Sequence, residues 1–308
     1  MHRTVQITAS VGATQSLLAE LRAIDGVVGL HHQPGASIVP PGDVITVHSL
    51  NRATDLVMKA AKNARSLGPL SVVTAEIASM SDIDHQAAID NDVDEAMWEE
   101  LETGLRHQGR ITANFLLLMA LGGIIGAAGA LAEPSVASLA YVASAIIAPG
   151  FEPVAKIPLG IVLGRREVFA SGMISTIAGY ALLMIAAGST YLALAALHVV
   201  EPKAFLEGDA LHHVREPGAL LLMIGAAGAV AGVVIESAYR RSVIAGALVA
   251  LSIIEAASTA GIAGALGRWD IMGEALGRLA IDGLFILVAG IVVFGGKQLL
   301  VHRRAPLH

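Results

Sequence analysis

Residues 144–169 read SAIIAPGFEPVAKIPLGIVLGRREVF, and this stretch decides the fold. The apolar span that contains most of it, residues 135–163, exceeds the roughly 20 residues that a helix needs to cross the hydrocarbon core of a bilayer. Pro149, Pro153 and Pro158 interrupt it. Each proline lacks an amide donor and clashes with the preceding turn, so we predict a broken membrane-spanning helix. Irregular backbone at membrane depth is stable only where it is buried in protein or lines a wet cavity, which makes the break a candidate site.

The composition indicates that lipid is the main solvent. The 308 residues are 55% hydrophobic and 15% charged, against about 25% charged in soluble domains, and the mean hydropathy is +0.67. We therefore expect a polytopic protein of a bacterial-type inner membrane, with membrane lipid as its surroundings. The 33 glycines and 4% aromatic residues favour helices that pack closely on small residues. Small-residue faces such as residues 122–129 permit packing within one chain or between copies, so a homo-oligomer stays open.

Six stretches beyond residue 110 are long enough to span a bilayer. They are residues 111–132, 135–163, 168–200, 217–235, 242–266 and 271–296. Basic connections alternate with connections that are acidic, at Glu133 and at residues 201–216, or roughly balanced, at residues 268–274. The basic ones contain Arg106, Arg110, Arg165, Arg166, Arg240, Arg241, Lys297, Arg303 and Arg304. By the positive-inside rule, six spans then place both termini in the cytoplasm. The first residues show no apolar region typical of a cleaved signal peptide.

The second half of the membrane region repeats the first at an offset of 103 residues. The match aligns Glu152 with Glu255, Glu133 with Glu236, and Leu163-Gly164-Arg165 with Leu266-Gly267-Arg268. Each unit has three spans, an odd number, so the second would enter the membrane from the opposite side. This is the inverted-topology repeat found in many secondary transporters. The alternative is a chance match between two stretches rich in glycine, alanine and leucine. Coincident acids argue against chance, because charged residues are rare inside spans.

Residues 1–80 predict a cytoplasmic domain with the order β-α-β-β-α-β. Alternating Val5, Ile7 and Ala9 indicate a first strand, and later strands are expected near residues 27–30, 44–47 and 72–77. The second helix is expected to open at an Asn51 cap. This order is that of a ferredoxin-like, or ACT-like, α+β domain.

Residues 81–108 predict an acidic amphipathic linker helix. Residues 82–102 hold nine acids and no lysine or arginine, which makes nucleic acid an unlikely partner. Val93, Met97, Leu101 and Leu105 recur every four residues beside Trp98. This stripe fits a helix near the membrane surface and equally a helix that packs on the N-terminal domain. The remaining organisation is transmembrane repeat 1 at 109–200, an extracytoplasmic loop at 201–216, repeat 2 at 217–298 and a cytoplasmic tail at 299–308.

The substrate or ion site is expected at the broken span. Glu152 lies inside the break formed by Pro149, Gly150 and Pro153, where freed amides and helix ends could bind an ion. Lys156 is four residues further on, close enough to neutralise Glu152 if the stretch is helical. The alternative is a kinked helix whose polar groups only satisfy one another.

Glu255 lies within the fifth span with no charged neighbour for a dozen residues on either side. An ionised carboxylate in hydrocarbon is costly, so it should be protonated, paired or facing water. We hypothesise that Glu152 and Glu255 approach each other about a pseudo-two-fold axis and share Lys156, with Thr259 at the position that matches Lys156. Asp282 follows Arg278 by four residues, which favours an ion pair at the membrane interface, with a role in the pathway as the second interpretation.

Other chemistry finds little support. The chain has no cysteine, so thiolate metal sites and cysteine nucleophiles are excluded. His212-His213 could bind a metal, but adjacent side chains diverge and no third ligand is evident, so a solvated loop is favoured. No phosphate-binding loop, dinucleotide motif or hydrolase elbow occurs. We therefore expect no catalytic residue, no metal, no cofactor and no enzyme activity.

The whole layout resembles the bacterial membrane family known as domain of unknown function 389. The resemblance rests on the split N-terminal domain, the tryptophan-bearing acidic linker and the broken span at residues 144–169. Members often have paired prolines where this chain has Ile254-Glu255, and an asparagine-containing turn where it has Asp282-Gly283. The resemblance implies a cytoplasmic N-terminal domain and a permease-like core, and it supplies no substrate.

Two functions follow from these features. The first is a transporter or channel for a small polar solute or ion, with the N-terminal domain as regulator. The second is a membrane-anchored regulatory or scaffold protein whose intramembrane carboxylates are structural.

Overall fold

The computed structural model describes residues 2–93, 95–215, 217–238 and 243–302. Within them the side chains of 202, 204, 209, 210 and 243–251 are not described. The chain forms two compact units, Met1–Trp98 with Gly296–His308, and Glu99–Gly295. Arg240, Arg241, Arg303 and Arg304, on which part of the predicted topology depends, lie outside the described residues.

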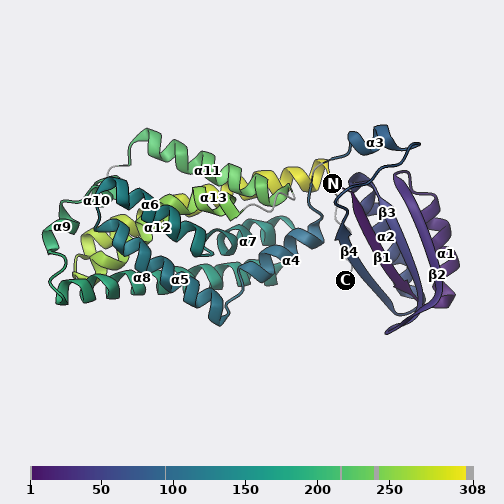
Figure 1. The fold of residues 1–308 in the computed structure, drawn as a ribbon, viewed down its shortest axis with the longest axis horizontal. Helices are drawn as coiled ribbons and strands as arrows, with labels where there is room; N and C mark the ends of the chain where they lie inside the picture. The colour runs from purple at the N-terminus through teal and green to yellow at the C-terminus, as the bar shows by residue number, and fades with distance from the viewer. Residues whose placement is uncertain (1, 94, 216, 239–242, 303–308) are drawn as a thin grey trace. The chain divides into compact units, whose positions relative to one another are not determined.

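The N-terminal part of the first unit is a four-stranded antiparallel sheet with helices (Figure 1). Its elements are β1 (Arg3–Ala9), α1 (Val11–Arg22), β2 (Val27–Ile38), β3 (Pro41–Ser49), α2 (Thr54–Ala64) and β4 (Leu70–Glu76). The strand order is β2-β3-β1-β4. The predicted order of strands and helices is confirmed.

Period-two alternation explains the core of this sheet. Val5, Ile7 and Ala9 of β1 are buried, and Ile45 and Val47 lie opposite the first two on β3. Because successive side chains of a strand point to opposite faces, this one face packs on the helices. The buried helix residues are Ala13, Leu17, Leu18, Leu21, Val57, Met58, Ala60, Ala61 and Ala64.

Two local features differ from simple sequence patterns. Pro34-Gly35, a pair typical of turns, lies inside β2, which continues to Ile38 past a register shift between Gln33 and Ser37. Asn51 does not cap α2, whose N-cap is Ala53. The Asn51 amide instead donates to the carbonyls of Val93 and Glu95, at 3.0 and 2.6 Å. A sequence pattern cannot distinguish a local cap from such a long-range bond.

The acidic segment forms two short helices instead of one long one. They are α3 (Gln86–Asp90) and α4 (Trp98–Gln108). Met97, directly before α4, joins the core of the N-terminal domain. Leu101 and Leu105 of α4 are buried as well. Packing on the N-terminal domain therefore accounts for the start of the stripe.

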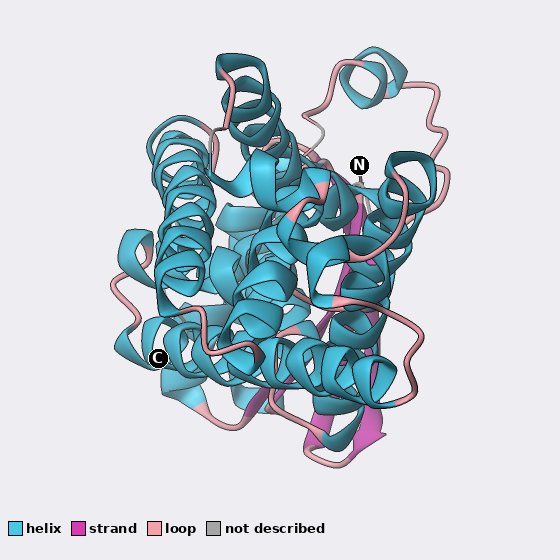
Figure 2. Cartoon of the chain, turned by 90° about the vertical axis from the view of Figure 1, so that its left-hand side faces the viewer, coloured by secondary structure: helices cyan, strands magenta, loops and turns pink. Residues whose placement is uncertain are grey.

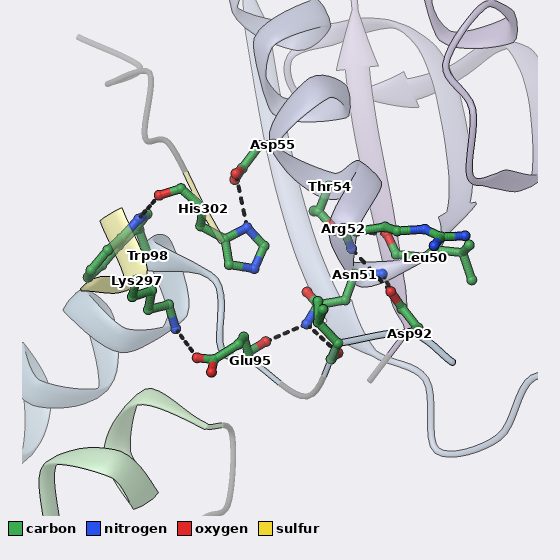
Figure 3. A network of polar contacts seen from close by, with 11 residues as sticks. Leu50, Asn51, Arg52, Thr54, Asp55, Asp92, Glu95, Trp98, Lys297 and His302 are labelled. Carbon is green, nitrogen blue, oxygen red and sulfur yellow. Dashed lines mark hydrogen bonds and ion pairs between the residues drawn. The ribbon is translucent and has the colours of Figure 1, made fainter. Parts of the chain in front are cut away.

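The C-terminal end of the chain is bound to the first unit (Figure 3). Trp98 Nε1 donates to the His302 carbonyl at 2.9 Å, and Lys297 Nζ lies 5.3 Å from the centre of the Trp98 ring. Lys297 also pairs with Glu95 at 3.0 Å, and His302 Nδ1 lies 2.9 Å from Asp55 Oδ2. We call these residues the C-terminal clasp.

The second unit is a bundle of helices, several of which run roughly alongside one another and are seen end-on in Figure 2. Its elements are α5 (Ala113–Ala130), α6 (Pro134–Ile147), α7 (Phe151–Val162), α8 (Arg166–Ala196), α9 (Pro202–Leu206), α10 (Asp209–Arg215), α11 (Ala219–Ser237), α12 (Val243–Ala265) and most of α13 (Trp269–Leu300). In the described part, α5, α8, α11 and α13 are long and apolar enough to cross a membrane, and the pair α6 and α7 makes five. Helix α12 has 23 residues and is described only in part.

The predicted break is present. Helices α6 and α7 meet at 53°, with Pro149 and Gly150 between them and Pro153 in the first turn of α7. Pro158 lies inside α7, and the helix continues past it to Val162.

Helices α7 and α12 end in the same way. Gly164 and Gly267, 103 positions apart, both have positive φ, at 63° and 70°. The next amide, of Arg165 or Arg268, donates to the carbonyl five residues earlier at 2.8 or 2.9 Å. This is the left-handed helix end that glycine allows without a steric penalty. Helices α8 and α13 then begin at Arg166 and Trp269, again 103 positions apart.

Candidate functional site

The break between α6 and α7 is held by Tyr180 of α8. The Tyr180 hydroxyl donates to the Gly150 carbonyl at 3.2 Å, and Tyr180 is buried. A Cβ on Gly150 would lie 2.7 Å from this hydroxyl oxygen. Glycine is therefore required here by space, and a carbonyl freed by the break is satisfied by a side chain from another helix.

Glu152 lies in the first turn of α7, just past the break. Its Oε2 atom is buried and has no hydrogen-bond partner among the described residues. Its charge acts on Tyr180 and on Glu236 of α11. A carboxylate near the start of a helix is stabilised by the helix dipole, yet an unpartnered buried oxygen indicates that a proton, water or cation completes the site.

Lys156 does not bridge the two glutamates. Its Nζ atom donates to the Gly109 carbonyl at 2.5 Å and lies 3.3 Å from Ser171 Oγ. The hypothesis that Glu152 and Glu255 share Lys156 is therefore wrong. The helical spacing allowed an ion pair, but a side chain four residues along a helix can also turn toward a neighbouring segment.

Glu255 of α12 pairs with a histidine of α10. Its Oε1 atom lies 3.4 Å from His213 Nδ1, and its side chain is 14% exposed. The charges of Arg278 and Asp282 also act on Glu255, and Glu255 acts on the hydroxyl of Tyr141. The expectation of a solvated loop holds only in part, because His213 is well exposed but lies in helix α10, and its Nδ1 atom contacts a carboxylate of the bundle.

Asp282 and Arg278 form the predicted ion pair on α13. Arg278 Nε donates to Asp282 Oδ2 at 3.1 Å, and the two side chains are 3% and 2% exposed. Gly225 of α11 makes room for the pair, since a Cβ there would lie 3.3 Å from Asp282 Oδ1. The Nη1 and Nη2 atoms of Arg278 have no hydrogen-bond partner among the described residues. This pair lies inside the bundle.

These groups form one electrostatic cluster, which we call the carboxyl cluster. It contains Glu152, Glu236, Glu255, Asp282 and Arg278. Tyr180 connects Glu152 to Asp282, because the charges of both act on its hydroxyl. Asp282 in turn acts on Glu255. Glu152 and Glu255, which the predicted repeat aligns, are thus linked through other residues, and no direct contact between them is among the described interactions.

Buried hydroxyl groups without partners lie in the same helices. Thr259, the residue matched to Lys156, and its neighbour Ser258 are fully buried on α12. Their hydroxyl oxygens, and those of Thr176 on α8 and Tyr141 on α6, have no hydrogen-bond partner in the described part of the chain. Buried polar groups in proteins are nearly always satisfied, often by ordered water. The polar interior of the bundle is therefore suited to hold water or an ion.

Sequence reasoning missed Tyr180, Glu236 and His213 as members of the site. Glu236 aligns with Glu133 in the predicted repeat and directly follows the predicted span at residues 217–235. The sequence does offer a signal for Glu236, because this residue is an acid next to an apolar run. Tyr180 and His213 reach the site only through tertiary packing, so no spacing in the sequence reveals them.

The fold and the site define the class of the protein. Over the residues that the structure describes, it is a mostly helical protein with four or five candidate membrane-spanning helices, and a small N-terminal antiparallel sheet with helices. Residues 145–288 match the family model described as "Domain of unknown function (DUF389)". The match confirms, over this range, the resemblance inferred from the sequence, and the range includes the break, Tyr180 and all five residues of the carboxyl cluster. Comparisons with curated proteins and with solved structures gave no match.

Proposed function

We propose that the protein is a membrane transporter or channel for a small cation, protons included, and that the carboxyl cluster lines its path. The observation that carries this proposal is the charge balance. Four carboxyl groups lie inside a helical bundle, and the guanidinium of Arg278 acts on two of them, those of Glu255 and Asp282. Uncompensated charge inside a membrane protein is costly, so protons or cations must neutralise the remainder. A site that needs bound cations for neutrality is suited to take them up and release them.

A proposed inverted repeat agrees with this function. The matched ends of α7 and α12 and the matched starts of α8 and α13 agree with three-helix units 103 residues apart. In this proposal α12 is the sixth span. Helix α12 is continuous from Val243 to Ala265, whereas its counterpart is broken into α6 and α7, so the two units differ at the site.

Two helix crossings agree with a pseudo-two-fold axis. A Cβ on Gly188 of α8 would lie 2.6 Å from the Gly261 carbonyl oxygen of α12. At the repeat offset of 103 residues, Gly188 corresponds to position 291 of α13, and Gly261 corresponds to Pro158 of α7. Gly290 of α13 packs against the ring of Pro158. Each unit thus crosses the other at related positions, as expected for transporters built from inverted repeats.

The proposal assigns the bacterial inner membrane as the location, with both termini in the cytoplasm. The positive-inside rule supports this orientation through Arg106, Arg110, Arg165, Arg166 and Lys297. The N-terminal domain is then cytoplasmic and is joined to α13 through the C-terminal clasp. Since α13 also carries Arg278 and Asp282, it offers a covalent route by which the domain regulates the path. No enzymatic step is proposed.

The test is ion flux in proteoliposomes. Glu152→Gln and Glu255→Gln remove a charge from the path while keeping the side-chain shape. We expect each to lower flux by about tenfold or more, which corresponds to about 1.4 kcal/mol in the barrier. Glu133→Gln is the matched control, because Glu133 is the exposed repeat counterpart of Glu236. Dye-reported proton uptake and radiolabelled sodium or potassium uptake identify the cation.

The alternative is a membrane-anchored regulatory or scaffold protein. The full burial of the Arg278–Asp282 pair is the observation that favours it, because such pairs also serve as structural links between helices. In that case neutralising Glu152 or Glu255 changes the unfolding temperature, and wild-type proteoliposomes show no flux above empty liposomes.

A further inference from the structure

A cleft opens between α4, α7 and the start of α8. None of the residues that line it belongs to the carboxyl cluster. The cleft has a volume of about 250 Å³, and it is lined by Arg106, Lys156, Glu167, Val168 and Ser171. The proposed transport path makes no use of it.

The cleft contains a buried ammonium group. Lys156 is 1% exposed, and its recorded partners are neutral, the Gly109 carbonyl and the Ser171 hydroxyl. No acid pairs with Lys156 within the described part of the chain. A buried charge usually has a counter-ion, because desolvation costs several kcal/mol. An ammonium has three donors, so one donor remains for a ligand.

Two glycines make space for this side chain. A Cβ on Gly109 would lie 2.8 Å from Lys156 Cε, and a Cβ on Gly172 would lie 2.9 Å from Lys156 Cβ. Any larger residue at either position would push the lysine away. The position of the ammonium is therefore built by three separate segments of the chain.

A like charge lies near the lysine. The charge of Arg106 acts on Lys156. Arg106 pairs with Glu102 at 2.5 Å, and Arg165 lies 3.5 Å from the same carboxylate. One carboxylate is thus shared by two guanidinium groups. Two neighbouring cations repel each other unless an anion lies between them.

The start of α8 adds backbone donors. Its N-cap, Arg165, makes no side-chain cap bond, and the first amides of a helix have no partner within the helix. Glu167 and Val168 of this first turn line the cleft. Amides at a helix start favour phosphate groups, and the single acid in the lining, Glu167, can accept a hydrogen bond from a protonated phosphate oxygen.

We propose that this cleft binds a phosphate group, held by Lys156, Ser171, Arg106 and the first turn of α8. Two sources share this chemistry, the headgroup of an anionic lipid and free phosphate. The cleft lies beside Arg106 and Arg165, which the topology proposal places at the cytoplasmic side.

The experiment measures binding to the full chain in two arms. In detergent, inorganic phosphate is titrated against the purified protein, with chloride at equal ionic strength as reference, and the unfolding temperature is followed. In phosphatidylcholine nanodiscs with or without phosphatidic acid, lipid retained by the protein is counted by native mass spectrometry. Stabilisation by phosphate supports a soluble source, and selective retention of phosphatidic acid supports a lipid source.

Lys156→Met and Arg106→Gln test the assignment. Loss of a charge-assisted hydrogen bond predicts about tenfold weaker binding for each. Arg106 is 58% exposed, so its variant keeps the test valid if Lys156→Met does not fold. Lys59→Met removes an exposed lysine of the N-terminal domain and should bind as the wild type does. Absence of binding in both arms, or equal binding by wild type and Arg106→Gln, overturns the proposal.

Discussion

Arg278 donates to Asp282 at 3.1 Å from one turn earlier on the same helix, and both side chains are almost completely buried. A pair at this spacing on an exposed helix face would contribute only a few tenths of a kcal/mol. Inside the bundle the charges of both members act on Glu255, and the charge of Asp282 also acts on the hydroxyl of Tyr180. It is the centre of the carboxyl cluster.

Removing one member of this pair should be strongly destabilising. Arg278→Met leaves Asp282 buried without its partner, and we expect a loss of about 3–5 kcal/mol in stability. Arg215→Met is the control, because Arg215 pairs with Glu274 at 2.6 Å with both side chains well exposed, a type of pair worth at most about 1 kcal/mol. Unfolding in mixed micelles with increasing denaturant measures both. Equal effects would show that the buried pair is not held in a low dielectric.

The two glycines that end α7 and α12 should respond alike to substitution. Gly164→Ala and Gly267→Ala place a side chain at positive φ, which costs about 1 kcal/mol or more. Gly12→Ala is the opposite control, because Gly12 lies in α1 with open space around it and alanine should stabilise that helix. Thermal unfolding measures all three. A strong effect at only one of the first two positions would count against equivalent roles in a repeat.

Acid should destabilise the N-terminal domain through Asp43. The Gly35 amide donates to Asp43 at 2.8 Å, and with the hydroxyl of Thr14 and the His32 ring it holds the pKa of Asp43 below its ordinary value of 3.8. A lowered pKa in the folded state adds stability above about pH 4, which is lost as pH falls through the folded pKa. Hydrogen exchange of β1 and β3 amides, corrected for intrinsic rate, follows this loss.

Asp43→Asn should flatten that pH dependence and lower the protection at neutral pH. Asp25→Asn changes an exposed aspartate of the same domain and serves as control. If both variants keep the wild-type pH profile, the hydrogen bonds to Asp43 do not stabilise the folded domain.

The C-terminal clasp should open when its polar contacts are removed. Lys297→Met removes the ion pair with Glu95 and the contact with the Trp98 ring. We expect faster hydrogen exchange at residues 298–302, by about fivefold if the contacts contribute about 1 kcal/mol. Leu299→Gln is the matched control, since Leu299 is 69% exposed. Equal exchange in Lys297→Met and wild type would mean that this lysine does not hold the end of α13.

The features that the sequence predicted best depend on local periodicity and on residues that are close together in the chain. Alternation at Val5, Ile7 and Ala9 predicted β1, and the prolines around Glu152 predicted the break. The i, i+4 spacing predicted the Arg278–Asp282 pair. These features depend on backbone sterics and on short separations, which a sequence shows directly.

The partners of the site residues could not be predicted. Lys156 turns to Gly109, Glu255 meets His213, and Asn51 binds the backbone at Val93. Each contact joins residues more than 40 positions apart, and its formation depends on how whole helices pack. Local spacing restricts which residues can pair but does not choose among distant partners.

The most direct test of the account is the ratio of cation flux in Glu152→Gln to that in Glu133→Gln, at equal amounts of folded protein in proteoliposomes. Both variants replace one carboxylate by an amide, one beside the helix break and one on an exposed helix start. A path lined by the carboxyl cluster predicts a ratio of about one tenth or less, with unfolding temperatures that remain close to each other. A ratio near one would contradict the claim that the carboxyl cluster lines the path.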